Sequence, residues 1–166
     1  AMDASGKITD LFGGQEDIKK KIIKTVGEPK ERFSEDSLRL LRAVRFATVL
    51  GFSIEDKTLK AIRENTEWLR AISKERIRDE FVKLVDGAYA EQALQVARET
   101  GILKVIMPEL IEGFEVEQNR DHIYDVWTHL LKALTHGTDK GFPFHVKLSA
   151  LFHDIGKPRT KKFDKE

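Results

Sequence analysis

The chain has 166 residues, enough for one domain of ordinary size or parts of two small ones. Its 29 basic and 28 acidic residues nearly cancel, so the net charge favours no class of partner. The absence of cysteine excludes disulfides and cysteine-ligated metals and fits a reducing compartment. No apolar run approaches the ~20 residues of a membrane span, and the first ten residues lack the apolar stretch of a signal peptide. We therefore expect a soluble, cytoplasmic protein.

The first 33 residues carry short signals of β-structure. Residues 7–14 predict the end of a strand that runs into a glycine turn. Residues 22–27 are β-branched and predict a second short strand, which Gly27 and Pro29 would end. We expect a small α/β element in this part of the chain.

From Ser34 onward the apolar residues recur with a helical period. Ser34 suits the N-cap of a helix, and Glu35 and Asp36 would lie in its first turn, where carboxylates interact favourably with the helix dipole. Gly51 suits the end of this helix. Similar patterns predict helices at about residues 56–65, 74–85, 89–100, 121–136 and 143–153. The expected fold class is mainly α, with a small α/β remnant followed by an all-helical body.

The predicted helix after Ser34 carries a high density of charge. Asp36, Arg39 and Arg42 would fall within a sector of roughly 120°, and Asp36 and Arg39 are spaced to form an i,i+3 pair. One interpretation is structural, a cap and a surface ion pair worth only ~0.3–0.5 kcal/mol. The other is recognition, because a guanidinium and a carboxylate together can read the edge of a nucleobase. Arg42, one turn further on, would suit a phosphate.

Several motifs, in one order along the chain, resemble a known family. The stretch RFSEDSLRLLRAVRF is similar to the E-D-x-x-R motif and arginine-rich continuation of class II tRNA nucleotidyltransferases, the bacterial CCA-adding and poly(A) polymerase family. The later stretch ISKERIRDEFVKLV resembles the helical neck of these enzymes. The similarity runs from about Gly6 to Lys157.

The resemblance implies roles for the charged residues of the motif. In the family, the aspartate and arginine hydrogen-bond the base of incoming CTP or ATP, roles that fall here on Asp36 and Arg39. It also implies that the neck and the nucleotide are held by Glu35, Arg42 and Arg45. The tRNA 3′ end is the implied second substrate, and Mg²⁺ the metal of nucleotidyl transfer.

The resemblance also divides the chain into three parts. It implies a remnant of the nucleotidyltransferase head at residues 1–33, a helical neck that recognises nucleotide and binds RNA at 34–110, and a partial HD domain at 111–166. The family's head contains an Asp-x-Asp pair that holds two metal ions, and no residues here match it. We therefore expect an internal segment of a longer polypeptide, without catalytic residues and inactive by itself.

The stretch ALFHDIGKP resembles the H-D signature of metal-dependent phosphohydrolases. It implies that His153 and Asp154 are metal ligands, and the similar helix DHIYDVWTHLLKAL implies that His129 is a third. Imidazoles with a carboxylate suit a divalent transition metal or Mg²⁺ that activates water. No residue presents itself as the fourth ligand of this family.

The other histidines have simpler interpretations. His122 and Asp125 lie on nearly the same helical face as His129, so they could support it through hydrogen bonds. His136 and His145 are interpreted as surface residues.

Two other functions remain open from the sequence. A stand-alone HD phosphohydrolase would need the missing fourth metal ligand. A non-catalytic RNA-binding helical module would explain the basic residues of the neck, which could contact the RNA backbone, but not a paired Asp36 and Arg39. The sequence also leaves open whether the parent adds CCA, CC, A or poly(A), and what its oligomeric state is.

Overall fold

The computed structural model describes residues 4–6, 8–116 and 123–160. It is mainly helical with one small sheet, which confirms the expected fold class. The elements in chain order are α1 (Gly14–Lys20), β1 (Ile22–Ile23), α2 (Pro29–Glu35), α3 (Leu38–Leu50), β2 (Ser53–Ile54), α4 (Asp56–Asn65), the 3-10 helix η1 (Thr66–Ala71), α5 (Lys74–Asp86), α6 (Ala90–Glu99), α7 (Ile102–Ile106), α8 (Pro108–Ile111), α9 (Val126–Asp139), α10 (Phe144–Phe152) and α11 (Lys157–Thr160).

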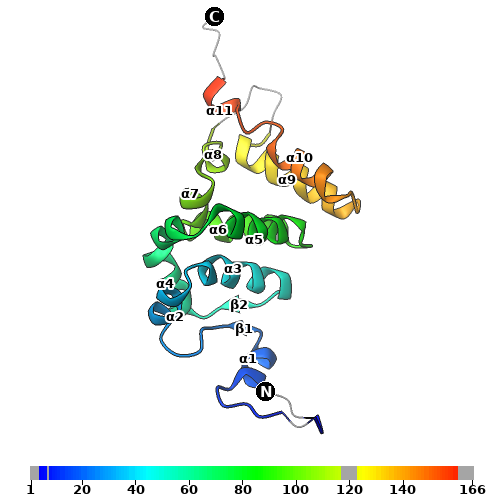
Figure 1. Cartoon of the computed structure of the whole chain (residues 1–166). Helices are drawn as coiled ribbons and strands as arrows, with labels where there is room; N and C mark the ends of the chain where they lie inside the picture. Colours follow the sequence, from blue (N-terminus) through cyan, green and yellow to red (C-terminus); the bar gives the residue numbers. More distant parts are fainter. Residues whose placement is uncertain (1–3, 7, 117–122, 161–166) are drawn as a thin grey trace, which may run out of the picture.

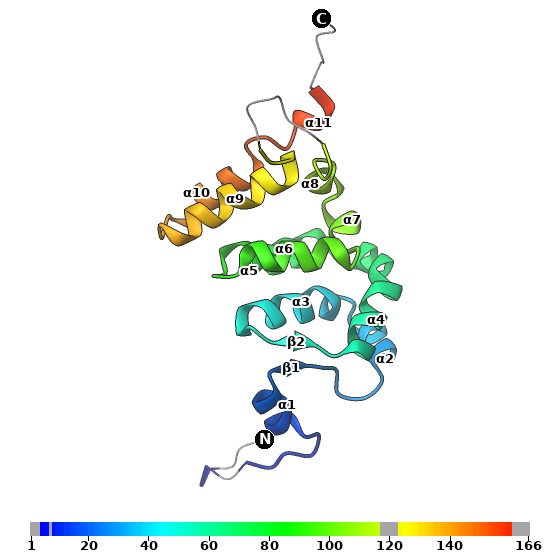
Figure 2. The same ribbon diagram turned by 180° about the vertical axis from the view of Figure 1, so that it is seen from behind.

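The helices stack in successive layers along one long direction (Figures 1 and 2). The pair α9 and α10 lies toward one end, α5 and α6 form the next layer, and α3 packs against both α5 and α6. The small sheet and α1 lie toward the other end. The layer of α5 and α6 therefore lies between the motif-bearing helix α3 and the helices of residues 126–160.

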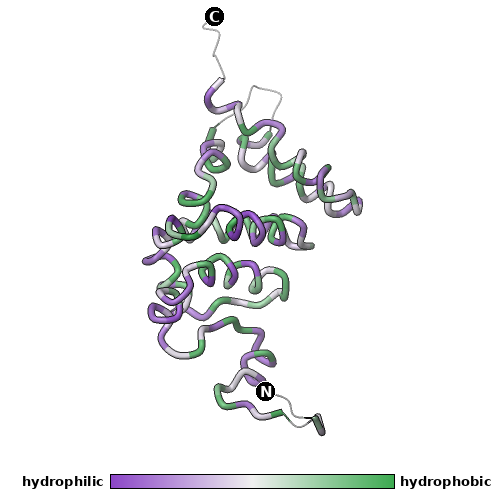
Figure 3. The backbone as a smooth tube through the Cα atoms, viewed as in Figure 1, coloured by the Kyte–Doolittle hydropathy of each residue, from purple (hydrophilic) through white to green (hydrophobic). Residues whose placement is uncertain are grey.

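The core is one continuous cluster of buried apolar side chains that runs through these layers. Apolar and polar residues alternate along the helices (Figure 3), so most of the helices can bury one face. The fully buried members include Leu40, Leu41 and Val44 of α3, Leu84 and Val85 of α5, Leu94 of α6, and Leu130, Leu131 and Leu134 of α9.

The sheet has two parallel strands, with Ile22 opposite Ser53 and Ile23 opposite Ile54. Parallel pairing requires a crossover, which α2 and α3 supply. The strand predicted at 22–27 is thus present in its first two residues. The strand end predicted at 7–14 is wrong for the described residues, since Ile8 makes only an isolated bridge. Instead, the Asp10 carboxylate accepts hydrogen bonds from the amides of Gly14 and Gln15, at 3.0 and 2.8 Å, and so favours a helix there.

The helix predicted to begin at Ser34 is in fact two helices with a break at Asp36. Ser34 is not an N-cap, because it lies inside α2 and its hydroxyl donates to the carbonyl of Glu31 at 2.8 Å. Asp36 has extended backbone angles, φ −152° and ψ 99°, and its side chain accepts from the Leu38 amide. A short carboxylate side chain that bonds the nearby backbone competes with helix formation, which accounts for the break.

The remaining predicted helices are present, with shifts at their ends. The ranges 56–65 and 74–85 correspond closely to α4 and α5, and 89–100 and 143–153 to α6 and α10. The helix predicted at 121–136 begins at Val126 among the described residues, because Asp125 caps α9 by accepting from the Thr128 amide at 2.7 Å. Residues 121 and 122 lie outside the described residues.

Candidate nucleotide and metal sites

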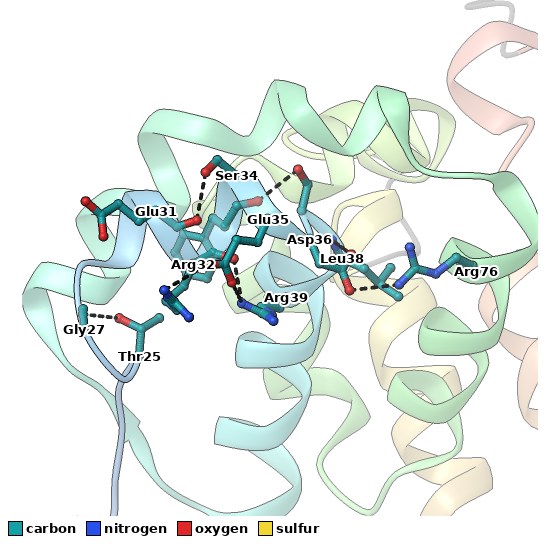
Figure 4. Close-up of polar contacts among 12 residues, drawn as sticks. Thr25, Gly27, Glu31, Arg32, Ser34, Glu35, Asp36, Leu38, Arg39 and Arg76 are labelled. Atoms are coloured by element: carbon teal, nitrogen blue, oxygen red, sulfur yellow. Dashed lines mark hydrogen bonds and ion pairs between the residues drawn. The ribbon is translucent and has the colours of Figure 1, made fainter. Parts of the chain in front are cut away.

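Asp36 lies at the junction of α2 and α3 and is held from two sides (Figure 4). Its Oδ1 accepts from the Leu38 amide at 3.2 Å, and its Oδ2 accepts from Nη2 of Arg76, in α5, at 2.9 Å. Burial by itself would raise the pKa of Asp36, but the hydrogen bonds from Arg76 and Leu38 outweigh it, so the pKa is lowered. The carboxylate is therefore ionised at neutral pH, and 25% of the side chain remains exposed.

Glu35 joins two arginines across the break between the helices. Its Oε1 accepts from Nη2 of Arg32 at 2.8 Å, and its Oε2 accepts from Nη1 of Arg39 at 2.7 Å. The same Arg39 nitrogen donates to the backbone oxygen of Arg32 at 3.0 Å (Figure 4). Arg39 is thus fixed to the end of α2 rather than to its own helix.

The predicted pair between Asp36 and Arg39 is therefore wrong as a direct contact. The i,i+3 spacing applies only within a continuous helix, and Asp36 lies outside α3. Each residue has another partner, Arg76 for Asp36 and Glu35 for Arg39. Asp36 nevertheless lies just before α3, and Arg39 lies in the first turn of α3.

Arg45 makes a buried ion pair with α5. Its Nε donates to Oε2 of Glu80 at 2.7 Å, and the two side chains are only 14% and 8% exposed. The guanidinium also lies over the ring of Phe46, 4.2 Å from its centroid. Burial would raise the pKa of Glu80, but the bonds from Arg45 and Lys83 outweigh it and lower the pKa. Arg45 therefore holds α3 against α5, the structural part of its predicted role.

A cavity of about 510 Å³ opens beside the first turns of α3. Two of the predicted nucleotide-binding residues, Arg39 and Arg42, line it, whereas Asp36 and Arg45 bind residues of α5. Two further cations, Lys24 and Arg32, also line it, and its apolar walls include Ile23, Val26, Phe33, Ala43 and Phe46. A concave site with apolar walls and several cations suits a ligand that combines a flat ring with phosphates.

The sequence interpretation counted Arg76 among the basic residues of the neck but did not identify Arg76 and Glu80 of α5 as partners of the motif. Their i,i+4 spacing places them on one face of the helix, and Glu80 falls among the apolar positions Ile77, Phe81 and Leu84. A carboxylate on an apolar helical face is almost never buried without a partner. The position of Glu80 among apolar residues could therefore have predicted a cationic partner on the helix packed against α5.

The structure brings His129 of α9 together with His153 and Asp154, which follow α10. The two Nε2 atoms lie 3.0 Å apart, and Oδ2 of Asp154 lies 3.5 Å from Nε2 of His129 and 3.2 Å from Nε2 of His153. All three ligand atoms lie within 4.8 Å of one another. Atoms that bind one ion at about 2.0–2.2 Å are separated by roughly 3.0–3.5 Å in octahedral or tetrahedral arrangements, so this spacing fits a single cation.

The hydrogen bonds around the triad suit ligand chemistry. Nδ1 of His153 lies 2.8 Å from the carbonyl of Ala150, and a neutral imidazole that donates there would present the lone pair of Nε2 to a metal. Burial would raise the pKa of Asp154, but the bond from Lys157 and the charges of the imidazoles outweigh it and lower the pKa. Lys157 donates to the same Oδ2 at 2.7 Å, so its ammonium would compete there with a metal cation.

The other predicted residues near the triad have different positions. Asp125 uses its carboxylate at the start of α9, where it accepts from the amides of Thr128 and Glu115. His136 and His145 are exposed, as expected of surface residues. The support predicted from His122 lies outside the described residues.

The described part of the chain contains no helix with the length and apolar character needed to cross a membrane.

Comparison with known proteins relates this arrangement to one class. Residues 51–114 match the family described as "Probable RNA and SrmB-binding site of polymerase A". The fold matches that of a crystal structure of a tRNA nucleotidyltransferase complexed with a primer tRNA and an incoming ATP analog, with a TM-score of 0.67 and 25% identity over 89% of this chain and 42% of that one. In sequence and fold the chain is similar to part of the CCA-adding enzymes and tRNA nucleotidyltransferases, which agrees with the resemblance of its motifs, whereas the HD domain stays a prediction.

Within this class the similarity is to CCA-adding enzymes. The chain is 55% identical over 102 residues to the CCA-adding enzyme of Geobacillus sp. (strain WCH70), which covers 61% of this chain and 25% of the relative. The crystal structure of the Bacillus stearothermophilus CCA-adding enzyme in complex with CTP matches with a TM-score of 0.64 and 34% identity, over 96% of this chain and 45% of that one. The matched part is thus about a quarter of the curated relative's length.

Proposed function

We propose that this chain is a segment of an enzyme that adds CCA, or part of it, to tRNA 3′ ends from CTP and ATP. The observation that carries the proposal is the cation-lined cavity beside α3, in a segment similar to a CCA-adding enzyme in complex with CTP. A nucleoside triphosphate has the flat base and the negative charge that this lining would bind. An enzyme that acts on tRNA in a bacterium works in the cytoplasm, where we place it.

The charged residues of the motif would bind different parts of the nucleotide. Arg39 offers two parallel donors to a base edge, and Asp36 offers an acceptor to the exocyclic amine that cytosine and adenine share and that uracil lacks. Arg42, with Lys24, would bind phosphate oxygens. The structural support would come from Glu35, which orients Arg39, and from Arg45, which holds α3 on α5.

The three predicted parts of the chain have different roles in this proposal. Residues 1–33 belong to the nucleotidyltransferase head, in agreement with the exposed side chains of Leu11, Phe12 and Ile18, which suit a surface covered by more protein. Residues 34–110 form the neck that recognises nucleotide and contacts tRNA, and residues 111–166 are part of an HD domain. The divalent ions of nucleotidyl transfer, Mg²⁺ in the first place, would be held by carboxylates outside this segment.

The test is incorporation of labelled CTP or ATP into tRNA that lacks its 3′ end. The complete polypeptide containing this segment should label such tRNA, and tRNA that already ends in CCA is the matched control. The isolated 166-residue chain should label neither, since none of its residues match the Asp-x-Asp pair that would hold the two metal ions. Incorporation by the isolated chain that survives repurification, or none by the complete polypeptide, would overturn the proposal.

A second candidate function rests on the convergence of His129, His153 and Asp154. We propose that these residues hold one divalent cation, a transition metal or Mg²⁺, which when bound would supply an activated water for phosphate ester hydrolysis. The protein's own part is to fix the imidazoles, as the Ala150 carbonyl does for His153.

Titration of the metal-free chain with Mn²⁺ in a calorimeter tests this second function without an activity assay. His129→Ala should weaken Mn²⁺ binding at least tenfold, as loss of metal-site partners typically costs about 10–100-fold in affinity. His136→Ala, which changes an exposed histidine of the same helix, is the control. Equal binding by both variants would contradict the assignment.

A further inference from the structure

Helix α5 contacts the motif at two points from one of its faces. Arg76 and Glu80 are four residues apart, so they lie one above the other on α5. Arg76 binds Asp36 just before α3, and Glu80 binds Arg45 in the middle of α3. The buried contact of Glu80 fixes the distance between the helices. The more exposed contact of Arg76 therefore acts on the Asp36 carboxylate within an interface that is already fixed.

The contacts of Asp36 leave it able to accept one more hydrogen bond at each oxygen. Oδ1 accepts one bond from Leu38 and Oδ2 accepts one from Arg76, whereas each carboxylate oxygen has two lone-pair sites. Because a quarter of the side chain is exposed, an amine from a ligand can reach it. Arg76 thus orients the carboxylate without using up its capacity to accept.

Apart from Arg76, the cation whose charge lowers the pKa of Asp36 is Arg39. Arg39 is three residues further along the chain, and its charge already acts on the Asp36 carboxylate. A direct pair between these two groups would satisfy each with the other, so that neither would be free to read a base. In the structure, Arg76 and Glu35 hold one group each and so keep the two apart.

We infer that Arg76 is a positioning residue that sets nucleotide choice, by holding the Asp36 carboxylate away from Arg39 and open to the exocyclic amine of cytosine or adenine. This inference rests on the proposed function. It assigns to the neck helix α5 a role in selecting C and A over U, although Arg76 belongs neither to the motif nor to the cavity lining.

The experiment compares kcat/KM for CTP and UTP in the complete polypeptide carrying Arg76→Gln, with Arg78→Gln as the matched control. Arg78 lies two residues further along α5, and its partner among the described residues is the exposed neighbour Asp79. Arg76→Gln should lower the preference for CTP over UTP on the order of tenfold, the equivalent of about 1.4 kcal/mol. Arg76→Lys, which keeps a cationic donor, should restore most of the preference, and Arg78→Gln should leave it unchanged.

A cycle with Asp36→Ala separates positioning from a purely structural role. If Arg76 acts through Asp36, the double variant should have the same preference as Asp36→Ala alone. An unchanged CTP preference in Arg76→Gln, or an equal loss for both nucleotides together with a lower melting temperature than Arg78→Gln, would overturn the inference. Failure of the proposed function is distinct, because the unmodified polypeptide would then incorporate no nucleotide at all.

Discussion

Removal of the Glu80 carboxylate should destabilise the chain strongly, although Glu80 does not line the cavity beside α3. Glu80→Ala leaves the Arg45 guanidinium in an interface where only 14% of its side chain is exposed. Breaking a buried ion pair by removing one partner costs about 3–5 kcal/mol. The stacking of Arg45 on Phe46 remains in the variant, so we expect a loss near the lower end, about 3 kcal/mol. In a domain of this size that corresponds to a fall in Tm of roughly 6–12 °C.

Urea unfolding followed by circular dichroism measures this loss directly. The matched control is Lys83→Ala, which removes the exposed second partner of Glu80 and should cost less than ~1 kcal/mol. The double variant Arg45→Met with Glu80→Leu should recover most of the stability, since apolar replacement of a buried pair is often close to neutral. A loss below ~1 kcal/mol for Glu80→Ala would refute the reasoning, because the pair would then contribute no more than a surface one.

The same pair predicts a dependence of stability on pH. The pKa of Glu80 is lower in the folded chain than in the unfolded chain, where a glutamate has a pKa of about 4.3. Its contribution to the free energy of unfolding is therefore fully present above that value and is lost as the pH falls through the lower folded pKa. The double variant without this pair should lose less stability between neutral and acidic pH than the unmodified chain.

Further predictions concern residues at the two candidate sites. Arg39→Ala in the complete polypeptide should broaden or abolish nucleotide choice while stability changes by less than ~1 kcal/mol, and a variant that unfolds would show that the arginine is structural. Asp125→Ala should cost about 1–2 kcal/mol through loss of the α9 cap, measured by urea unfolding, and no change would mean that water replaces the cap. Mn²⁺ affinity should fall on acidification, because imidazole ligands must be neutral. A pH-independent affinity would exclude His129 and His153 as ligands.

The helices could be predicted from the sequence where periodicity and end signals agree. Residues 56–65 became α4 because the apolar positions and the acidic first turn indicate the same helix. The convergence of His129 with His153 and Asp154 followed from a resemblance of two motifs. His129 and His153 are 24 residues apart in the sequence, and this spacing alone would not have predicted that their Nε2 atoms lie 3.0 Å apart.

The charged contacts of the motif could not be predicted in the same way. A continuous helical period runs through residues 34–50, and it gives no indication that Asp36 would leave the helix to bond the Leu38 amide. The partners of Asp36 and Arg45 lie 40 and 35 residues further along the chain. Local spacing reports only neighbours on the same element, so contacts between α3 and α5 depend on how the helices pack.

Helix α5 contacts residues both before and after it in the chain, so the direction in which each of its side chains points matters for both sets of contacts. Arg76 and Glu80 face α3, and Asp86 at the end of the same helix binds the ammonium of Lys147 in α10. One residue inserted between Glu80 and Asp86 would turn the end of α5 by about 100° and advance it by about 1.5 Å relative to its start. The Lys147 contact would then be lost even though every side chain was retained. α5 should therefore tolerate substitution on its exposed face far better than any change in its length.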